Sequence, residues 1–368
     1  MFAKSAAKIA FYLLICNRRQ RLLWEIIKFA IYFISAVMGF NSFFLSTILI
    51  LFSLPIFADD WDYDILGDGY EVTRLYMKPD YSGNVTASLI RKLCVNESGR
   101  AILYVHGYND YFFQKELGNQ FVGNGYDFYA LDLRKYGRSY MQGQELFETR
   151  DLSEYFEDVT AALDVIAESG CKEIVLMGHS TGGLILSYFM AKGMAEGYPV
   201  KALLLNSPFL DMNLDNLTEN YVLPVVAWLS ILNNDIKINQ GADDLYARSL
   251  LKEYDGEWEY DTSWKLVVSP DVTVGWLHAI TDAQKFLHKG VDIRQPILLM
   301  RSERSSADYL LSDMVLDVDE ISKYGKRLGA DVTEYVVKNG LHDLFLSCKP
   351  VRYPLYAAMF NWLRSKGL

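Results

Sequence analysis

Short apolar and β-branched runs recur along the chain between residues 71 and 337, and they predict the strands of a sheet. Most are continuous apolar runs, which is typical of strands that are buried on both faces. Eight strands are predicted, over residues 71–77, 85–91, 101–105, 127–131, 173–177, 202–205, 297–300 and 332–337. The first two flank a stretch rich in Pro, Gly, Asn and Ser, so we expect them to pair as an antiparallel hairpin.

Stretches with helical periodicity alternate with these strands. In residues 151–169 apolar side chains recur at three- and four-residue spacing, and Gly170 follows as a stop signal. Further helices are expected over residues 184–194 and 318–328. Strands that alternate with helices after an antiparallel start predict an α/β fold with a mostly parallel central sheet.

The alternation stops between about residues 207 and 290. This stretch holds four of the seven tryptophans and several short amphipathic pieces, and the strand pattern resumes at Ile297. We interpret it as an insertion between two strands that forms a helical cap over the carboxyl edge of the sheet. A second layer of ordinary core helices is the alternative.

The chain from Phe29 to Ala58 contains no charged residue over 30 positions, and basic residues precede it. As a helix it would be about 45 Å long, more than the ~30 Å hydrocarbon core of a bilayer. Residues 1–58 are therefore expected to be a signal peptide cleaved after Ala58 or a membrane anchor, with membrane association through residues 22–57. Either interpretation places residues 59–368 outside the cytoplasm, in a secreted, periplasmic or membrane-anchored domain.

The charge of the chain excludes some partners. The sequence has 36 basic and 46 acidic residues, and six basic and one acidic residue lie in 1–58. The remaining residues thus carry 30 basic and 45 acidic side chains, a net charge of −15. Such an acidic body is not expected to bind nucleic acid.

Cysteine usage gives no sign of a metal centre. Cys94, Cys171 and Cys348 follow residue 58, and their spacing is not that of metal ligands. We expect neither a metal nor an organic cofactor.

The clearest chemical motif is Gly178-His179-Ser180-Thr181-Gly182, which fits G-x-S-x-G. A predicted buried strand enters it and an apolar helical stretch leaves it. This is the context of a nucleophile elbow, in which a serine stands on a sharp turn between strand and helix. Ser180 is therefore the candidate nucleophile, and it needs a base within hydrogen-bond reach.

His342 is the candidate base, because it follows the last predicted strand and precedes a final helix. The chain order of serine, acid and histidine then requires the acid after the strand at 297–300. Four aspartates qualify by position: Asp308, Asp313, Asp317 and Asp319. We assign the acid to Asp313, with Asp308 and Asp317 as the alternatives.

Acyl transfer also needs hydrogen-bond donors for the developing oxyanion. The backbone N–H of Thr181, directly after the nucleophile, is one candidate. Val105-His106-Gly107-Tyr108 follows an early strand, and the N–H of Tyr108 is the second candidate donor.

Four segments together resemble the monoglyceride lipase and lysophospholipase group of serine aminopeptidase-like α/β-hydrolases. They are residues 104–107, 132–139, 178–183 and 340–343, within a resemblance spanning roughly residues 65 to 365. Two departures stand out. Lys135-Tyr136 replaces the Gly-His of the D-x-R-G-H-G-x-S pattern, and the acid is displaced along the chain to a D-x-V-x-D-like segment that starts at Asp313.

The motifs predict a serine hydrolase that cleaves carboxylic esters through an acyl-enzyme. The resemblance implies a monoacyl lipid substrate, such as a monoglyceride or a lysophospholipid. Two alternatives stay open: an amidase or aminopeptidase with the same triad, and a non-catalytic extracytoplasmic binding module.

Overall fold

The computed structural model describes residues 61–96, 98–212, 233–239 and 241–368. Residues 61–368 form one compact unit. The expected signal or anchor in residues 1–58 lies outside the described residues. In the described part, no helix has the length and apolar character needed to cross a membrane.

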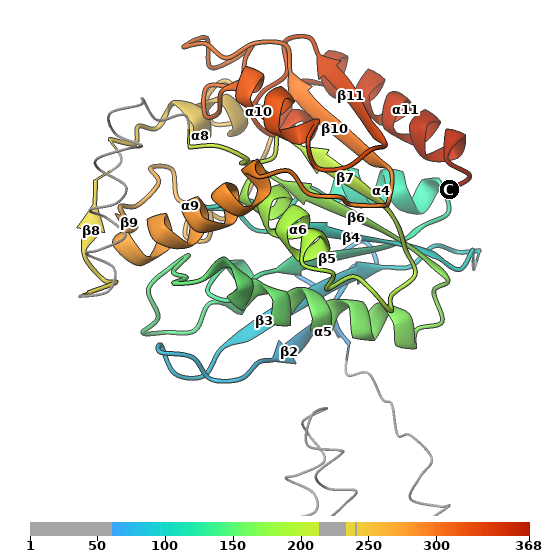
Figure 1. The fold of residues 1–368 in the computed structure, drawn as a ribbon, viewed down its shortest axis with the longest axis horizontal. Coiled ribbons are helices and arrows are strands. Elements are labelled where there is room, and N and C mark those ends of the chain that lie inside the picture. Colours follow the sequence, from blue (N-terminus) through green and yellow to red (C-terminus); the bar gives the residue numbers. More distant parts are fainter. Residues whose placement is uncertain (1–60, 97, 213–232, 240) are drawn as a thin grey trace, which may run out of the picture. The chain divides into compact units, whose positions relative to one another are not determined.

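A nine-stranded sheet forms the centre of this unit, in the order β1-β2-β3-β5-β4-β6-β7-β10-β11 (Figure 1). Its strands are β1 (Asp62–Tyr63), β2 (Glu71–Tyr76), β3 (Thr86–Lys92), β4 (Arg100–Val105), β5 (Asp127–Asp132), β6 (Glu173–His179), β7 (Val200–Asn206), β10 (Ile297–Ser302) and β11 (Val332–Val337). The first three strands and the β3–β5 pair are antiparallel, and the remaining neighbours are parallel. The predicted α/β fold with a mostly parallel sheet and an antiparallel N-terminal hairpin is confirmed.

The central parallel strands β4, β6, β7 and β10 are buried on both faces, as their continuous apolar runs predict, whereas the edge strand β11 is largely half-buried or exposed. In β4, Ala101, Leu103 and Val105 belong to one hydrophobic cluster, whereas Ile102 and Tyr104 belong to another. Alternate side chains of a strand point to opposite faces, so each central parallel strand contributes to two cores.

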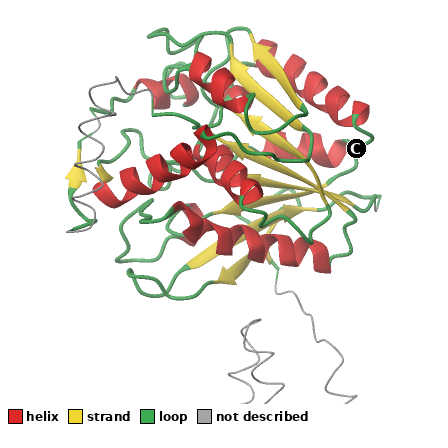
Figure 2. Cartoon of the chain, in the orientation of Figure 1, coloured by secondary structure: helices red, strands yellow, loops and turns green. Residues whose placement is uncertain are grey.

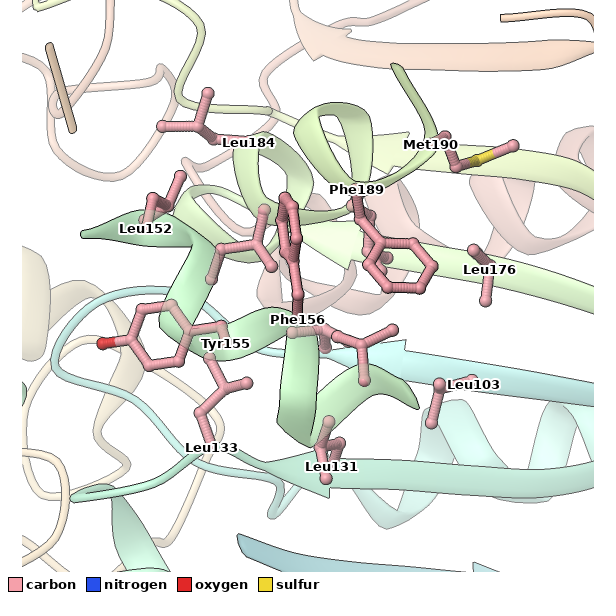
Figure 3. Packing of buried hydrophobic residues seen from close by; sticks show 14 of the residues in the cluster. Leu103, Leu131, Leu133, Leu152, Tyr155, Phe156, Leu176, Leu184, Phe189 and Met190 are labelled. Atoms are coloured by element: carbon pink, nitrogen blue, oxygen red, sulfur yellow. The ribbon is translucent and has the colours of Figure 1, made fainter. Parts of the chain in front are cut away.

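Helices cover both faces of the sheet (Figures 1 and 2). The main helices are α4 (Lys115–Gly123), α5 (Tyr155–Glu168), α6 (Thr181–Ala191), α9 (Val274–His288), α10 (Val318–Gly325) and α11 (Lys349–Ser365). Residues of α5, α6 and α9 pack into one core, and those of α4 and α11 into the other. Figure 3 shows the first core, where Phe156 of α5 and Phe189 of α6 lie against leucines of the central strands.

The insertion between β7 and β10 has two parts among the described residues. Helix α9 packs on α6 through pairs such as Tyr188 with Phe286, and so belongs to the helical layer. The segment with α8 (Leu245–Leu250) instead joins a third hydrophobic cluster, with side chains from the loops after β4 and β11. A two-stranded sheet of β8 (Lys237–Ile238) and β9 (Val272–Thr273) connects the two parts.

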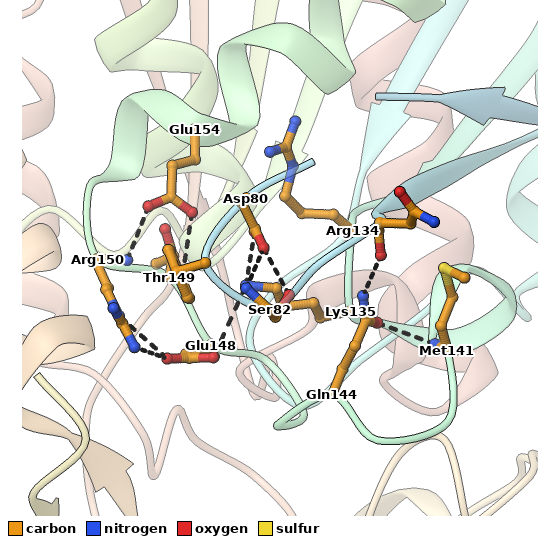
Figure 4. A network of polar contacts seen from close by, with 12 residues as sticks. Asp80, Ser82, Arg134, Lys135, Met141, Gln144, Glu148, Thr149, Arg150 and Glu154 are labelled. Carbon is orange, nitrogen blue, oxygen red and sulfur yellow. Dashed lines mark hydrogen bonds and ion pairs between the residues drawn. The ribbon is translucent and has the colours of Figure 1, made fainter. Parts of the chain in front are cut away.

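Lys135, one of the two departures from the family pattern, has a structural role in the loop after β5. Its side chain is fully buried, and its ammonium lies 2.9 Å from a carboxylate oxygen of Asp80 and 3.8 Å from one of Glu148 (Figure 4). Asp80 belongs to the turn of the N-terminal hairpin, so this ion pair ties the hairpin to the loop. Glu148 is paired in turn with Arg150, at 3.3 Å.

Candidate active site

Ser180 lies on a sharp turn between β6, which ends at His179, and α6, which begins at Thr181. Its φ and ψ are 51° and −119°, a conformation that is rare for a residue with a side chain. The flanking glycines make the turn sterically possible. A Cβ at Gly178 would come within 2.6 Å of the Gly182 backbone, and a Cβ at Gly182 within 2.3 Å of the Val105 carbonyl oxygen. The predicted nucleophile-elbow geometry is therefore present.

The structure brings Ser180, His342 and Asp313 together. His342 Nε2 lies 3.0 Å from Ser180 Oγ, and His342 Nδ1 lies 3.0 Å from Asp313 Oδ2. A carboxylate only accepts, so Nδ1–H donates to Asp313 and leaves Nε2 free to accept the hydroxyl proton of Ser180. The three side chains are buried, and Ser180 is 8% exposed.

Asp313 reaches His342 although it lies well beyond the end of β10 in the sequence. The loop after β10 turns back on itself, because the Asp313 N–H donates to the Arg304 carbonyl and the Ser306 N–H donates to the Asp313 carbonyl. The second carboxylate oxygen of Asp313 accepts the N–H groups of Val315 and Leu316. Both oxygens are thereby fixed in direction.

The other candidate acids have different partners. Asp308 is exposed and lies 3.9 Å from Arg304. Asp317 caps the N-terminus of α10 by accepting the N–H groups of Asp319 and Glu320, and Asp319 is exposed. Of the four aspartates that the sequence offered, Asp313 is the one that the structure places on the imidazole.

The loop after β4 lies directly against the serine. A Cβ at Gly107 would come within 3.0 Å of Ser180 Cβ, so glycine permits this close approach. His106 holds the loop to its neighbour: its Nε2 accepts the Leu133 N–H, and its Nδ1–H therefore donates to the Gly107 carbonyl. Tyr108 follows Gly107 immediately, so the two expected oxyanion donors, Tyr108 and Thr181, come from segments that flank Ser180 in space.

A second layer of buried polar side chains lies behind the triad. The ring of His179 packs 4.9 Å from that of His342, and its Nε2 lies 3.9 Å from an Asp343 oxygen. Burial lowers the pKa of His179, and the charge of Asp343 opposes this shift only in part. Asp343 also accepts hydrogen bonds from Asn206 and Gln114. This layer holds Asp343, the residue directly after His342.

Asp110, His179 and Asp343 are the described residues that most resemble a metal site. Each offers a ligand atom, and these atoms lie within 4.8 Å of one another. However, the ammonium of Lys265 is 2.9 Å from Asp110, and both side chains are buried. Burial alone would raise the pKa of Asp110, but the charge and hydrogen bond of Lys265, together with His106 and His179, outweigh it and the pKa is lowered. The arrangement is that of an internal ion pair rather than of a cation site.

Reasoning from the sequence missed this surrounding layer. Asp110 lies two residues after Tyr108, and Asp343 directly follows His342. This closeness in sequence to predicted site residues was the available signal for both. Asn206, Gln114 and Lys265 carry no motif, because they reach the site through the fold.

The sequence of residues 96–348 matches the family model of the serine aminopeptidases, S33 (Hydrolase_4), over more than half of the chain. The chain belongs to this family. A search of curated protein sequences finds no match. The expected resemblance to α/β-hydrolases is thus confirmed at the level of the family.

Solved structures support the same fold. A soluble variant of monoglyceride lipase from Saccharomyces cerevisiae matches with a TM-score of 0.57 at 17% identity, covering 80% of this chain and 96% of that one. A carboxyl esterase from Bacillus coagulans matches with a TM-score of 0.57 at 14% identity, covering 81% and 99%. The monoacylglycerol lipase of Paleococcus ferrophilus matches with a TM-score of 0.54 at 17% identity, covering 77% and 99%. At these identities the likeness shows the fold alone.

Proposed function

We propose that this chain is a serine hydrolase that cleaves carboxylic esters, with monoacyl lipids as its substrates. The observation that carries the proposal is the continuous hydrogen-bonded series from Ser180 Oγ through His342 to Asp313, placed on a strained elbow. A serine hydroxyl becomes nucleophilic when a positioned base takes its proton, and this series provides such a base.

The geometry supports a two-step reaction. Ser180 Oγ attacks the acyl carbonyl carbon while His342 Nε2 takes the hydroxyl proton. The N–H groups of Tyr108 and Thr181 stabilise the oxyanion. His342 then returns the proton to the departing alkoxide, which leaves as the alcohol. In the second step water attacks the acyl-enzyme, with His342 again accepting and then returning a proton to Ser180. Asp313 holds the imidazole in the productive tautomer throughout.

The lipid part of the proposal rests on the motif resemblance and on two solved structures of similar fold, one of a monoglyceride lipase and one of a monoacylglycerol lipase. Aromatic side chains of the insertion also lie beside the site. Tyr246 packs edge-on to the His342 ring at 5.7 Å, and the cluster with Trp258, Tyr260 and Trp264 lies beside it. An aromatic environment of this kind favours an acyl chain over a charged peptide.

The test uses the purified protein and the Ser180→Ala variant. Wild type should label with a fluorophosphonate probe and hydrolyse monoglycerides or lysophospholipids. Ser180→Ala should lose labelling and roughly a millionfold in kcat. A folded wild type that does not label would refute the proposal and favour a non-catalytic binding module.

Substrate preference distinguishes the proposed esterase from the amidase or aminopeptidase alternative. p-Nitrophenyl esters of graded chain length are compared with aminoacyl anilides at equal concentrations. Preference for longer acyl esters supports the lipase assignment. Faster turnover of the anilides would instead assign an aminopeptidase to the same three residues.

We further propose that residues 1–58 direct the catalytic domain out of the cytoplasm. The support is the uncharged stretch from Phe29 to Ala58 with its preceding basic residues. Protease treatment of intact cells or spheroplasts tests this, because an extracytoplasmic domain is degraded or released whereas a cytoplasmic one is protected.

A further inference from the structure

Two consecutive side chains after the expected oxyanion donor hold a distant part of the chain. Asn109 and Asp110 directly follow Tyr108, and both bind the segment of residues 264–269 within the insertion. Asn109 Nδ2 donates to the Leu266 carbonyl at 2.8 Å, and its Oδ1 accepts the Leu266 N–H at 2.7 Å. The Asn109 amide thus pairs with both backbone groups of Leu266, as a neighbouring strand would.

Further contacts reinforce this pairing. Asn109 Nδ2 lies 3.1 Å from Ser269 Oγ, and Lys265 forms its buried ion pair with Asp110 at 2.9 Å. Tyr111 Oη accepts the Asp261 N–H at 2.8 Å. Three successive residues of the loop after β4 are therefore attached to one short stretch of the insertion, and we call this set of contacts the 109–111 clamp.

The clamp acts on a backbone that would not keep its shape alone. Asn109 has a φ of 48°, in the left-handed region that asparagine enters more readily than most residues. Its side chain is 8% exposed, so its amide depends on protein partners. The ring of Tyr108 is held from the same insertion, 4.9 Å from the ring of Trp276 in α9. On the other side of Tyr108, Gly107 lies so close to Ser180 that an added Cβ would come within 3.0 Å of the serine Cβ.

We propose that the insertion segment 264–269 fixes the position of the loop that supplies the oxyanion donor Tyr108. Asn109 is the positioning residue that holds the Tyr108 N–H toward Ser180. This inference rests on the proposed function. The loop after β4 has no helix or strand of its own at residues 106–113. Oxyanion stabilisation depends on donors fixed before the charge develops, so the contacts that hold this loop set the rate. A segment that is remote in sequence thereby controls acyl transfer without touching the substrate.

The test measures turnover per active site for Asn109→Gly and Asn109→Asp. Glycine keeps the positive φ but removes every side-chain contact. Aspartate keeps the acceptor for the Leu266 N–H but cannot donate to the Leu266 carbonyl. The matched control is Asn239→Ala, since Asn239 lies within the insertion and donates to Asp271 at 2.8 Å, but has no hydrogen bond to residues 108–111 in the described part of the chain. Active-site concentration is titrated with the fluorophosphonate, so that misfolded protein does not count.

For Asn109→Gly we expect kcat on a short p-nitrophenyl ester to fall about 10- to 100-fold, with KM changed less than about threefold, because a small misplacement of a donor costs transition-state binding. Affinity for a trifluoromethyl ketone, whose tetrahedral adduct uses the same donors, should fall in parallel. Asn109→Asp places a carboxylate oxygen against the Leu266 carbonyl, and it should lose about as much as Asn109→Gly. If Asn109 had only a structural role, its replacement would lower the melting temperature and the labelled fraction but leave kcat per labelled site unchanged.

Two outcomes overturn the inference in distinguishable ways. If wild type labels and turns over but kcat per site in both Asn109 variants equals that of Asn239→Ala, the clamp does not position the donor. If wild type itself fails to label, the proposed function fails and the inference fails with it.

Discussion

At the scale of single residues, Asp313 is defined by what each of its carboxylate oxygens contacts. One faces His342 Nδ1 and the other accepts two backbone N–H groups. In Asp313→Asn the amide can turn its NH₂ group toward the imidazole and favour the wrong tautomer. We expect kcat to fall about 10⁴-fold. Asp308→Asn, at an exposed neighbour in the same loop, should leave ester turnover unchanged. A larger loss of kcat in Asp308→Asn than in Asp313→Asn would assign the catalytic acid to Asp308 instead.

Glu334 offers a pH-dependent test of stability away from the site. Burial disfavours its charge, but hydrogen bonds from Lys326 and Arg301 outweigh this and lower its pKa to about 2. A carboxyl whose pKa is depressed by folding stabilises the folded state above its unfolded pKa of about 4.5, and that stabilisation is lost as the pH falls toward 2.

We therefore expect Glu334→Gln to reduce the free energy of unfolding by about 2 kcal/mol at pH 7. The difference from wild type should shrink to less than half at pH 3, as measured by urea denaturation at each pH. Ester hydrolysis at pH 7 should be unaffected, because Glu334 lies on β11 and not at the site. A difference that stays constant from pH 7 to pH 3 would contradict the assigned pKa.

At the scale of secondary-structure elements, the elbow depends on how closely α6 approaches β4. A methyl group at Gly182 would meet the carbonyl oxygens of Val105 and His106 at 2.3 and 2.4 Å, and backbone cannot move aside as a flexible side chain can. Gly182→Ala should cost about 1–3 kcal/mol or more of stability and abolish fluorophosphonate labelling. The control is Gly123→Ala in α4, where the added methyl meets nothing within 4 Å and should be neutral or slightly stabilising. Normal labelling of Gly182→Ala would refute this account.

Predictions from the sequence succeeded where a hydrophobic period or a motif was present. All eight predicted strands occur, because each is rich in apolar or β-branched residues and most are continuous apolar runs. The pattern placed the helix after Ser180 at Leu184, whereas α6 begins at Thr181. The reason is that Gly182 and Gly183 give no helical signal, although close packing at the elbow requires them. The two-residue strands β1, β8 and β9 were missed, since two residues show no period.

The residues of the site also fall into two groups, those that carry a sequence motif and those that reach the site only through the fold. Ser180 and His342 were predicted from motif and chain order, and Asp313 was chosen among four aspartates from a sequence pattern; the structure brings these three side chains within hydrogen-bond distance. The partners of Lys135 and Asn109 could not be predicted, because Asp80 and Leu266 reach them through the tertiary fold. Contacts of this kind have no local signature in a single sequence.

At the scale of the whole molecule, the two main cores are described within the compact unit of residues 61–368. The start of this unit is fastened internally, since the guanidinium of Arg138 forms an ion pair with Asp64 at 2.7 Å and one with Asp132 at 2.8 Å. Both pairs are buried, so separating either partner would leave an uncompensated charge. The first strand thus has anchoring contacts of its own.

We therefore expect a protein that begins at Trp61 to fold without residues 1–60 and to retain fluorophosphonate labelling and short-ester turnover within about twofold of the full chain. Cooperative thermal unfolding and the titrated active-site fraction are the measurements. The mass of the protein matured from the full chain in cells then separates the two interpretations of residues 1–58: a mature N-terminus at Asp59 indicates a cleaved signal peptide, and an uncleaved chain in the membrane fraction indicates an anchor. A Trp61 protein that aggregates or lacks labelled sites, beside an active full chain, would show that the preceding residues are part of the folded enzyme.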